Sequence, residues 1–86
     1  MTDSIMFTKA KAFALRIVRL YKYLRDRKES VIAKQMLRSG TSIGANIAES
    51  RYAQSKSDFA AKLQISLKEA AETQYWLELL RDAIAC

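Results

Sequence analysis

Both glycines of this chain lie four residues apart, in a segment that otherwise has the composition of a helix. Gly40 and Gly44 belong to the stretch Ser39-Gly40-Thr41-Ser42-Ile43-Gly44-Ala45-Asn46-Ile47-Ala48-Glu49. Glycine costs roughly 1 kcal/mol relative to alanine inside a helix, so two glycines on one helical face need a structural reason. Their spacing predicts the close approach of another helix, within one bundle or between subunits. Access for a ligand is the third alternative.

Hydrophobic periodicity divides the 86 residues into three helices joined by short polar turns. The predicted helices cover residues 5–26, 31–50 and 56–84 of one domain that spans residues 1–86. Proline is absent and half of the residues are hydrophobic, which favours an all-α, antiparallel up-down helical bundle. Ser30 is the expected N-cap of the second helix. Ser55 with Asp58 predicts a capping box at the start of the third helix.

The third helix carries two apolar stripes rather than one. The first stripe consists of Phe59, Leu63, Ser66, Ala70, Thr73, Leu77 and Leu80. The second begins with Ile65, Trp76 and Leu79. A helix that is apolar on two sides either lies deep in a bundle or is shared between chains. Trp76 is therefore expected to be a core or interface residue rather than part of a ligand site.

Positive charge is concentrated in the first helix and the turn after it. Fifteen basic and nine acidic residues give a net charge of +6, which favours acidic partners such as nucleic acid. The expected phosphate contacts on the first helix are Lys11, Arg16, Arg19, Lys22 and Arg25. Tyr23, which lies among them, is a candidate for stacking on a base. The alternative is a solvated helix face that only keeps the protein soluble.

A second set of residues is expected to hold the helices or subunits together. Its members are Gly40, Ile43, Gly44, Asn46, Ile47, Glu49 and Trp76. Asn46 and Glu49 lie about one turn apart, so they are expected to pair in a buried polar network or to make a contact at the helix end. One carboxylate without a second catalytic group is poor evidence for an active site.

The chain lacks the residues of most catalytic and metal sites. Histidine is absent, which excludes Ser-His-Asp triads and histidine metal sites, and the single cysteine, Cys86, forms neither an internal disulfide nor a zinc cluster. The sequence therefore predicts a protein that is not an enzyme and has no cofactor and no metal. No apolar run is long enough to cross a bilayer, and early lysines and arginines argue against a signal peptide, so a cytoplasmic location is expected.

Three motifs resemble a bacterial four-helix-bundle family, some of whose members are encoded by intervening sequences within large-subunit ribosomal RNA genes. They are Gln35-Met36-Leu37-Arg38-Ser39, the stretch Thr41-Ser42-Ile43-Gly44-Ala45-Asn46-Ile47-Ala48-Glu49, and Ser57-Asp58-Phe59 with Ser66-Leu67-Lys68-Glu69-Ala70. The resemblance implies an up-down bundle that forms a homo-oligomer, often a pentamer. Similar proteins are accessory proteins of diversity-generating retroelements, so it also implies a reverse transcriptase and RNA or DNA as partners. The family has no established catalytic residues.

Two departures from the family pattern affect these expectations. Ser50 stands where family members usually have glycine, which argues against a tight left-handed helix end at this position. The chain ends at Cys86 together with its third helix, so the family's fourth helix is missing. Either the chain is a fragment or a partner supplies the missing surface.

The sequence as a whole predicts a self-assembling, non-enzymatic bundle that presents a basic surface. The expected partner of this surface is nucleic acid, a ribonucleoprotein or a reverse transcriptase, and no membrane is involved. The alternative is a protein–protein interaction module of unknown role that does not bind nucleic acid.

Overall fold

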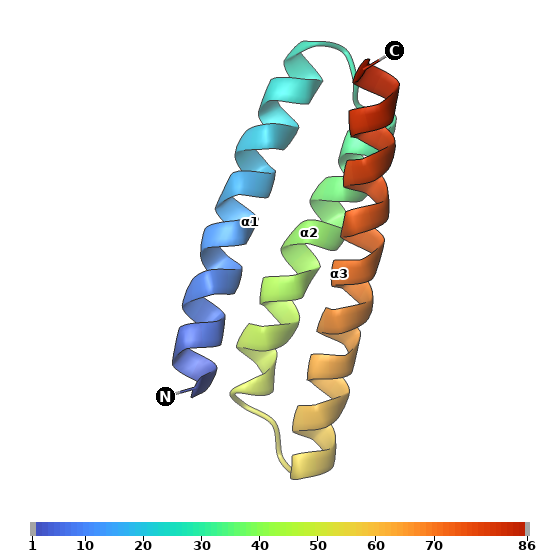
Figure 1. The fold of residues 1–86 in the computed structure, drawn as a ribbon. Coiled ribbons are helices and arrows are strands. Elements are labelled where there is room, and N and C mark those ends of the chain that lie inside the picture. The colour runs from blue at the N-terminus through green and yellow to red at the C-terminus, as the bar shows by residue number, and fades with distance from the viewer. Residues whose placement is uncertain (1, 86) are drawn as a thin grey trace.

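Three antiparallel α-helices make up the part of the chain that the computed structural model describes, residues 2–85 (Figure 1). They are α1 (Thr2–Asp26), α2 (Val31–Ser50) and α3 (Lys56–Ala85). The all-α prediction is confirmed, and α1 begins three residues before the predicted start. Cys86 lies outside the described residues, so the prediction that it forms neither a disulfide nor a zinc site stays a prediction.

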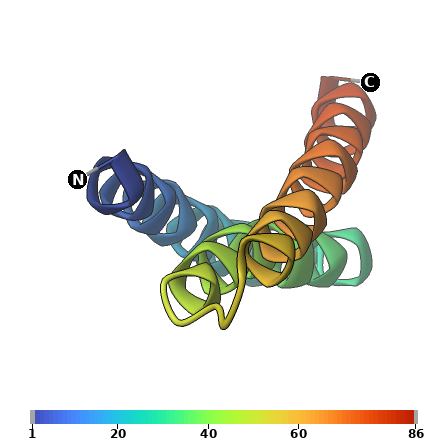
Figure 2. The same cartoon turned by 90° about the horizontal axis from the view of Figure 1, so that it is seen from below.

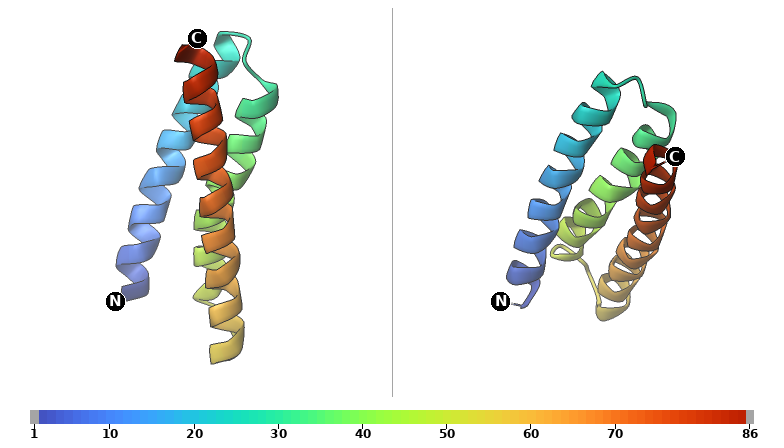
Figure 3. Two further views of the ribbon diagram at one scale, coloured as in Figure 1. Left: turned by 45° about the vertical axis from the view of Figure 1, so that its right-hand side comes forward. Right: turned by 45° about the horizontal axis from the view of Figure 1, so that its top comes forward.

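Helix α2 is the central element of this arrangement. Both α1 and α3 pack against α2, and no backbone contact joins α1 to α3 within residues 2–85. Seen from one end, α1 and α3 diverge from each other on the same side of α2 (Figure 2). The two further views in Figure 3 show the same elongated shape, which measures 46 × 18 × 16 Å.

Apolar side chains from all three helices form the core. Its buried residues are Ile17, Leu24, Ala33, Met36 and Leu80. Met36 of α2 is completely buried, with 0% of its surface exposed. Leucines and aromatic residues of α1 and α3 pack around this cluster, so α2 supplies the centre of the bundle.

The divergence of α1 and α3 leaves an apolar groove beside this core. The apolar lining consists of Phe13, Ile17 and Leu20 of α1 and Leu77 of α3, and Arg16 of α1 also lines the groove. Its volume is about 300 Å³. The groove therefore brings one of the predicted phosphate contacts next to an apolar surface.

The turn between α1 and α2 contains the left-handed residue of the structure. Among residues 2–85, Lys28 has the one positive φ of any non-glycine residue, 68°. The backbone N–H groups of Lys28 and Glu29 close the turn by donating to the Arg25 and Leu24 carbonyl oxygens at 2.9 and 3.0 Å. A Schellman-like end of this kind is usually formed by glycine, and here it terminates α1.

Ser30 occupies the N-cap position of α2, but its hydroxyl makes no capping hydrogen bond. With φ −125° and ψ −28°, its backbone is not in the β region typical of a capping serine. The Glu29 carboxylate accepts a hydrogen bond from the Ile32 N–H instead, at 3.3 Å. The predicted cap residue is therefore in the right place, and its neighbour does the capping.

The turn between α2 and α3 follows the expected pattern more closely. The Asp58 N–H donates to the Ser55 hydroxyl at 3.0 Å, as in a capping box. The Asp58 carboxylate accepts from the Gln54 N–H at 3.2 Å, one residue before the N–H that a standard box uses. At the end of α2, Arg51 remains right-handed, with φ −68°, which agrees with serine in place of glycine at position 50.

Candidate nucleic-acid interface

The two glycines lie against α1, and they do so in different ways. A Cβ atom on Gly40 would lie 2.9 Å from Cγ2 and 3.0 Å from Cγ1 of Ile17. A Cβ atom on Gly44 would lie 3.6 Å from the Ala10 carbonyl oxygen, an ordinary van der Waals distance. The two glycines thus allow α2 to lie close to α1. Gly40 faces the side chain of Ile17, and Gly44 faces the main chain at Ala10.

The neighbouring face of α2, which Ser39 and Ile43 share, forms a seam with α3 that contains small hydroxyl residues. The hydroxyl oxygens of Ser39 and Thr73 lie 2.8 Å apart and are hydrogen-bonded, and both residues are buried. The Ser66 hydroxyl donates to the Ile43 carbonyl oxygen at 2.9 Å. These contacts pair buried polar atoms across the two helices, which fixes how α3 is placed along α2.

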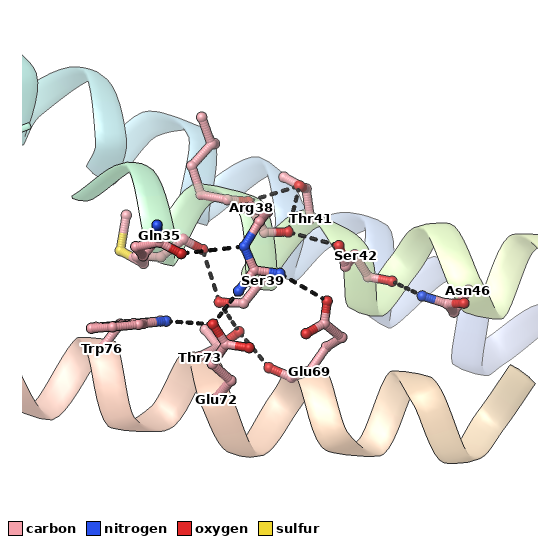
Figure 4. A network of polar contacts seen from close by, with 12 residues as sticks. Gln35, Arg38, Ser39, Thr41, Ser42, Asn46, Glu69, Glu72, Thr73 and Trp76 are labelled. Carbon is pink, nitrogen blue, oxygen red and sulfur yellow. Dashed lines mark hydrogen bonds and ion pairs between the residues drawn. The ribbon is translucent and has the colours of Figure 1, made fainter. Parts of the chain in front are cut away.

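Arg38 lies beside this seam and joins the two helices through carboxylates (Figure 4). Its guanidinium binds Glu69 at 3.2 Å and also binds Glu72. The Trp76 indole N–H donates to Glu72 at 2.9 Å. The hydrogen bond from Trp76, and after it the one from Arg38, lowers the pKa of the Glu72 carboxyl from its ordinary value. The Glu72 contact in turn raises the pKa of the Arg38 guanidinium.

The predicted pairing of Asn46 with Glu49 is wrong. The Asn46 amide donates to the Ser42 carbonyl oxygen of its own helix at 2.9 Å. Glu49 accepts from the Lys62 ammonium of α3 at 3.0 Å, and this contact raises the pKa of Lys62. Glu49 therefore makes a contact between helices near the end of α2, and its partner is a cation.

The remaining residues of the expected packing set lie in the interior or at its edge. Ile47 is buried at 6% exposure, and Ile43 is half-buried. Trp76 is half-buried against the core cluster. These positions therefore pack within their own bundle, while Ile43 and Trp76 each keep part of their surface exposed.

All five predicted phosphate contacts on α1 are exposed. Lys11, Arg16, Arg19 and Lys22 form no ion pair within the described residues. Arg25 has one carboxylate partner, the exposed side chain of Asp26 at 3.4 Å, and its guanidinium carbon lies 6.0 Å from the Tyr21 ring centroid. The sequence from residue 9 to residue 25 contains no acidic residue at all. The outward side of α1 is thus a surface of largely uncompensated positive charge.

These five residues form two rows rather than one line. At 3.6 residues per turn, Arg16 and Arg25 lie about 180° apart around the helix axis. One row contains Arg16 and Arg19, and it continues to the exposed Tyr23. The other contains Lys11, Lys22 and Arg25. The charge therefore covers about half of the circumference of α1, and a single straight strand of phosphates would contact one row better than the other.

Arg27 is a further member of the surface that the sequence analysis did not single out. Its guanidinium carbon lies 3.7 Å from the centroid of the Tyr23 ring. The spacing of four residues is the only signal of this contact in the sequence, because Arg27 lies in the turn where helical periodicity no longer applies. The first row thus ends in a stacked pair of an arginine and a tyrosine.

The described residues offer no metal centre and no membrane-spanning segment. Residues 2–85 contain no group of three acidic, cysteine or histidine side chains that could hold a metal ion. None of the three helices combines the length and the apolar character that crossing a bilayer requires. The distinctive chemistry of the described surface is therefore its positive charge.

Comparison with known proteins places this fold in a family. The family model for the 23S rRNA-intervening sequence protein matches residues 2–85. The chain belongs to this family. A crystal structure from the S23 ribosomal protein family of Bacteroides thetaiotaomicron, of a protein with unknown function, superposes with a TM-score of 0.94 at 56% sequence identity. The match covers all of this chain and 78% of that one. No curated protein matches the chain.

The family membership confirms the resemblance carried by the motifs of α2 and α3. The further resemblance to accessory proteins of diversity-generating retroelements is not addressed by these matches, and it stays a prediction. The 23S rRNA-intervening sequence protein family is described by the place of its gene, so the function has to be argued from the surface.

Proposed function

We propose that this member of the 23S rRNA-intervening sequence protein family is a non-enzymatic helical bundle that self-associates and presents the outward side of α1 to nucleic acid. The partner is free RNA or DNA, or nucleic acid within a ribonucleoprotein such as a reverse-transcriptase complex. One observation carries the proposal: the exposed cations of α1 have almost no carboxylates near them. The positive surface is therefore available to phosphate groups.

The contrast with the rest of the molecule supports this proposal. Arg38 and Lys62 of α2 and α3 are already paired with carboxylates. Unpaired cations such as Arg16 and Lys22 attract phosphates, and each contact releases a counterion from the nucleic acid. Binding should therefore depend on α1 and should weaken steeply as the salt concentration rises.

A charge-matched pair of triple variants tests the proposal. In the first variant, Arg16, Arg19 and Lys22 are each changed to Gln. This variant lacks three of the cations that bind phosphate. The plot of the logarithm of the binding constant against the logarithm of the salt concentration should therefore become less steep, by about 2 in slope, and affinity at low salt should fall by at least about tenfold. The measurement is fluorescence anisotropy of a labelled oligonucleotide at several salt concentrations.

The matched control changes Lys34, Lys56 and Lys68 to Gln. These side chains are exposed on α2 and α3, and both variants lower the net charge by three from +6. The control should bind nearly as well as the unchanged protein. Equal losses in the two variants would show that only net charge matters, and this result would refute a site on α1.

Self-association is the second part of the proposal, and the outer side of α3 supports it. Ile65 and Tyr75 lie on this side with 44% and 57% of their surfaces exposed. Apolar side chains at such positions are typical of interfaces between subunits. In a ring of copies, the fields of several α1 helices would add and strengthen binding. A pentamer is the state that the family resemblance implies.

Light scattering of the purified chain tests this part. Ile65→Asp should shift the molar mass toward that of one chain, because it places a charge in an apolar contact. Ala45→Asp introduces the same charge at an exposed position of α2, away from this side of α3, and should leave the mass unchanged. A single-chain mass for the unchanged protein would refute self-association.

The apolar groove between α1 and α3 favours a second candidate function, the docking of another protein. Phe13, Leu20 and Leu77 line this groove, and an amphipathic helix is the kind of partner that such a surface fits. Under this alternative the charge of α1 only maintains solubility. Recovery of one defined protein partner after nuclease treatment, together with no oligonucleotide binding at low salt, would favour it.

A further inference from the structure

We infer that Tyr23 and Arg27 form a stacking site for an unpaired base, so that the basic side of α1 binds single-stranded nucleic acid in preference to duplex. This inference rests on the proposed function and narrows it to one class of nucleic acid. It is carried by the stacked pair at the end of α1 and by the distribution of charge around that pair.

The pair has the geometry of an open stacking surface. The Arg27 guanidinium carbon lies 3.7 Å from the Tyr23 ring centroid, which is contact distance for a cation over a ring face. The Tyr23 side chain keeps 51% of its surface exposed. A planar guanidinium on an aromatic ring is itself a surface on which a base can stack.

The backbone of the turn after α1 holds Arg27 in this place. Its N–H donates to the Leu24 carbonyl oxygen at 3.0 Å, and the next N–H, of Lys28, donates to the Arg25 carbonyl oxygen at 2.9 Å. These bonds fix the turn that carries Arg27. A surface that is already ordered loses less conformational entropy when a ligand binds.

The charge around the pair favours a strand of phosphates. Arg16, Arg19 and Tyr23 follow each other at intervals of three and four residues, so they share one side of α1. The nearby carboxylates have other partners, because Glu29 caps the first turn of α2 and Asp26 pairs with Arg25. A strand whose base stacks on Tyr23 and Arg27 can thus lay its phosphates along Arg19 and Arg16.

Single strands and duplexes differ in what they can offer to this pair. The faces of bases inside a duplex are covered by neighbouring base pairs, whereas unpaired bases have free faces that can stack on aromatic side chains. Duplex therefore gains only the phosphate contacts of α1. A single strand gains these contacts and the stacking together, and base stacking of this kind amounts to about tenfold in affinity.

The test compares labelled oligonucleotides of about 12 nucleotides, single-stranded and duplex, as RNA and as DNA, by fluorescence anisotropy at low salt. The unchanged protein should bind the single strand about tenfold more tightly than the duplex. Tyr23→Ala should remove this difference and leave duplex binding unchanged. Tyr23→Phe should retain it, because the ring remains.

Two further variants distinguish the loss of stacking from a loss of charge and from the removal of any exposed tyrosine. Arg27→Lys keeps the charge but loses the planar group, so it should weaken single-strand binding only. Tyr52→Ala removes an exposed tyrosine of the turn between α2 and α3 that lies on no basic row, and it should change neither affinity. Circular dichroism checks that each variant is folded.

Three results would overturn the inference. Equal binding of single strand and duplex, with salt dependence and no effect of Tyr23→Ala, would refute the stacking site and leave the proposed function standing. A loss of both ligands in Tyr23→Ala would show a role that is not specific for unpaired bases. No binding of either ligand would refute the inference and the proposed function together.

Discussion

The outward side of α1 and the seam between α2 and α3 contain the same kinds of charged residue in opposite situations. On α1, Arg16 and Arg19 face solvent without a carboxylate partner within the described residues. At the seam, Arg38 is held between Glu69 and Glu72. An arginine whose charge is already balanced joins helices, whereas one whose charge is not balanced is available to a ligand. Partners, and not residue type, therefore distinguish the structural charges from the candidate binding charges.

The largest expected effect on stability comes from α2, the helix that packs against both α1 and α3. Met36→Ala removes a fully buried side chain of α2 from the core cluster and should lower the free energy of unfolding by about 3 kcal/mol. Arg19→Gln on the outward side of α1 should change it by no more than about 0.5 kcal/mol. Urea unfolding followed by circular dichroism measures both values.

A volume-conserving variant gives this comparison its control. Met36→Leu keeps the position filled and should cost less than about 1.5 kcal/mol. If Arg19→Gln proved as destabilising as Met36→Ala, the side chains of α1 would be structural, and the division into a stabilising seam and a binding surface would fail.

The two glycines should respond to alanine with opposite signs. Gly40→Ala places a Cβ atom 2.9 Å from the buried, β-branched Ile17, which has little freedom to move, so we expect a net loss of about 1 kcal/mol. Gly44→Ala meets its nearest atom at 3.6 Å and should gain up to about 1 kcal/mol from helix propensity. Thermal unfolding of the two variants side by side is the measurement. Equal and favourable shifts would mean that Ile17 leaves room for a Cβ atom at Gly40 in solution.

Much of the fold could be predicted from the sequence because it depends on periodicity. The buried stripe of α3 is an example, since Ser66, Thr73 and Leu80 lie inside the bundle as their spacing predicts. The uneven charge of α1 could be read in the same way. Helical geometry also places Arg16 and Arg25 about 180° apart around the axis of α1, so the five predicted phosphate contacts form two rows.

The contacts between helices could not be predicted in the same way. Arg38 lies 31 and 34 residues before its two carboxylate partners, and such pairs depend on how far one helix is shifted along the other. The spacing of Asn46 and Glu49 predicts that they pair or make a contact at the helix end, yet it does not identify Lys62 of α3 as the partner of Glu49. The stacking of Arg27 on Tyr23 depends on the conformation of a turn, which periodicity does not describe.

The smallest expected effect concerns pH and the network around Glu72. Hydrogen bonds from Trp76 and Arg38 lower the pKa of the Glu72 carboxyl in the folded state. Its ionised form therefore adds stability above the pKa of the unfolded chain, near 4.5, and this contribution is lost as the pH falls through the lower folded pKa. Glu72→Gln should lower the urea midpoint at pH 7 and reduce the difference between pH 7 and pH 3.

Glu78→Gln is the matched control for this prediction, because it removes the same charge from the same helix. Glu78 accepts a hydrogen bond from Gln74 at 3.2 Å and forms no ion pair within the described residues. Its variant should retain more of the acid response than Glu72→Gln does. If the two variants lost the same amount, the acid response would reflect overall charge. The ion pairs at the seam would then add no stability of their own. The carboxylate partners of Arg38 would not explain why this arginine joins helices, whereas the arginines of α1 are available to a ligand.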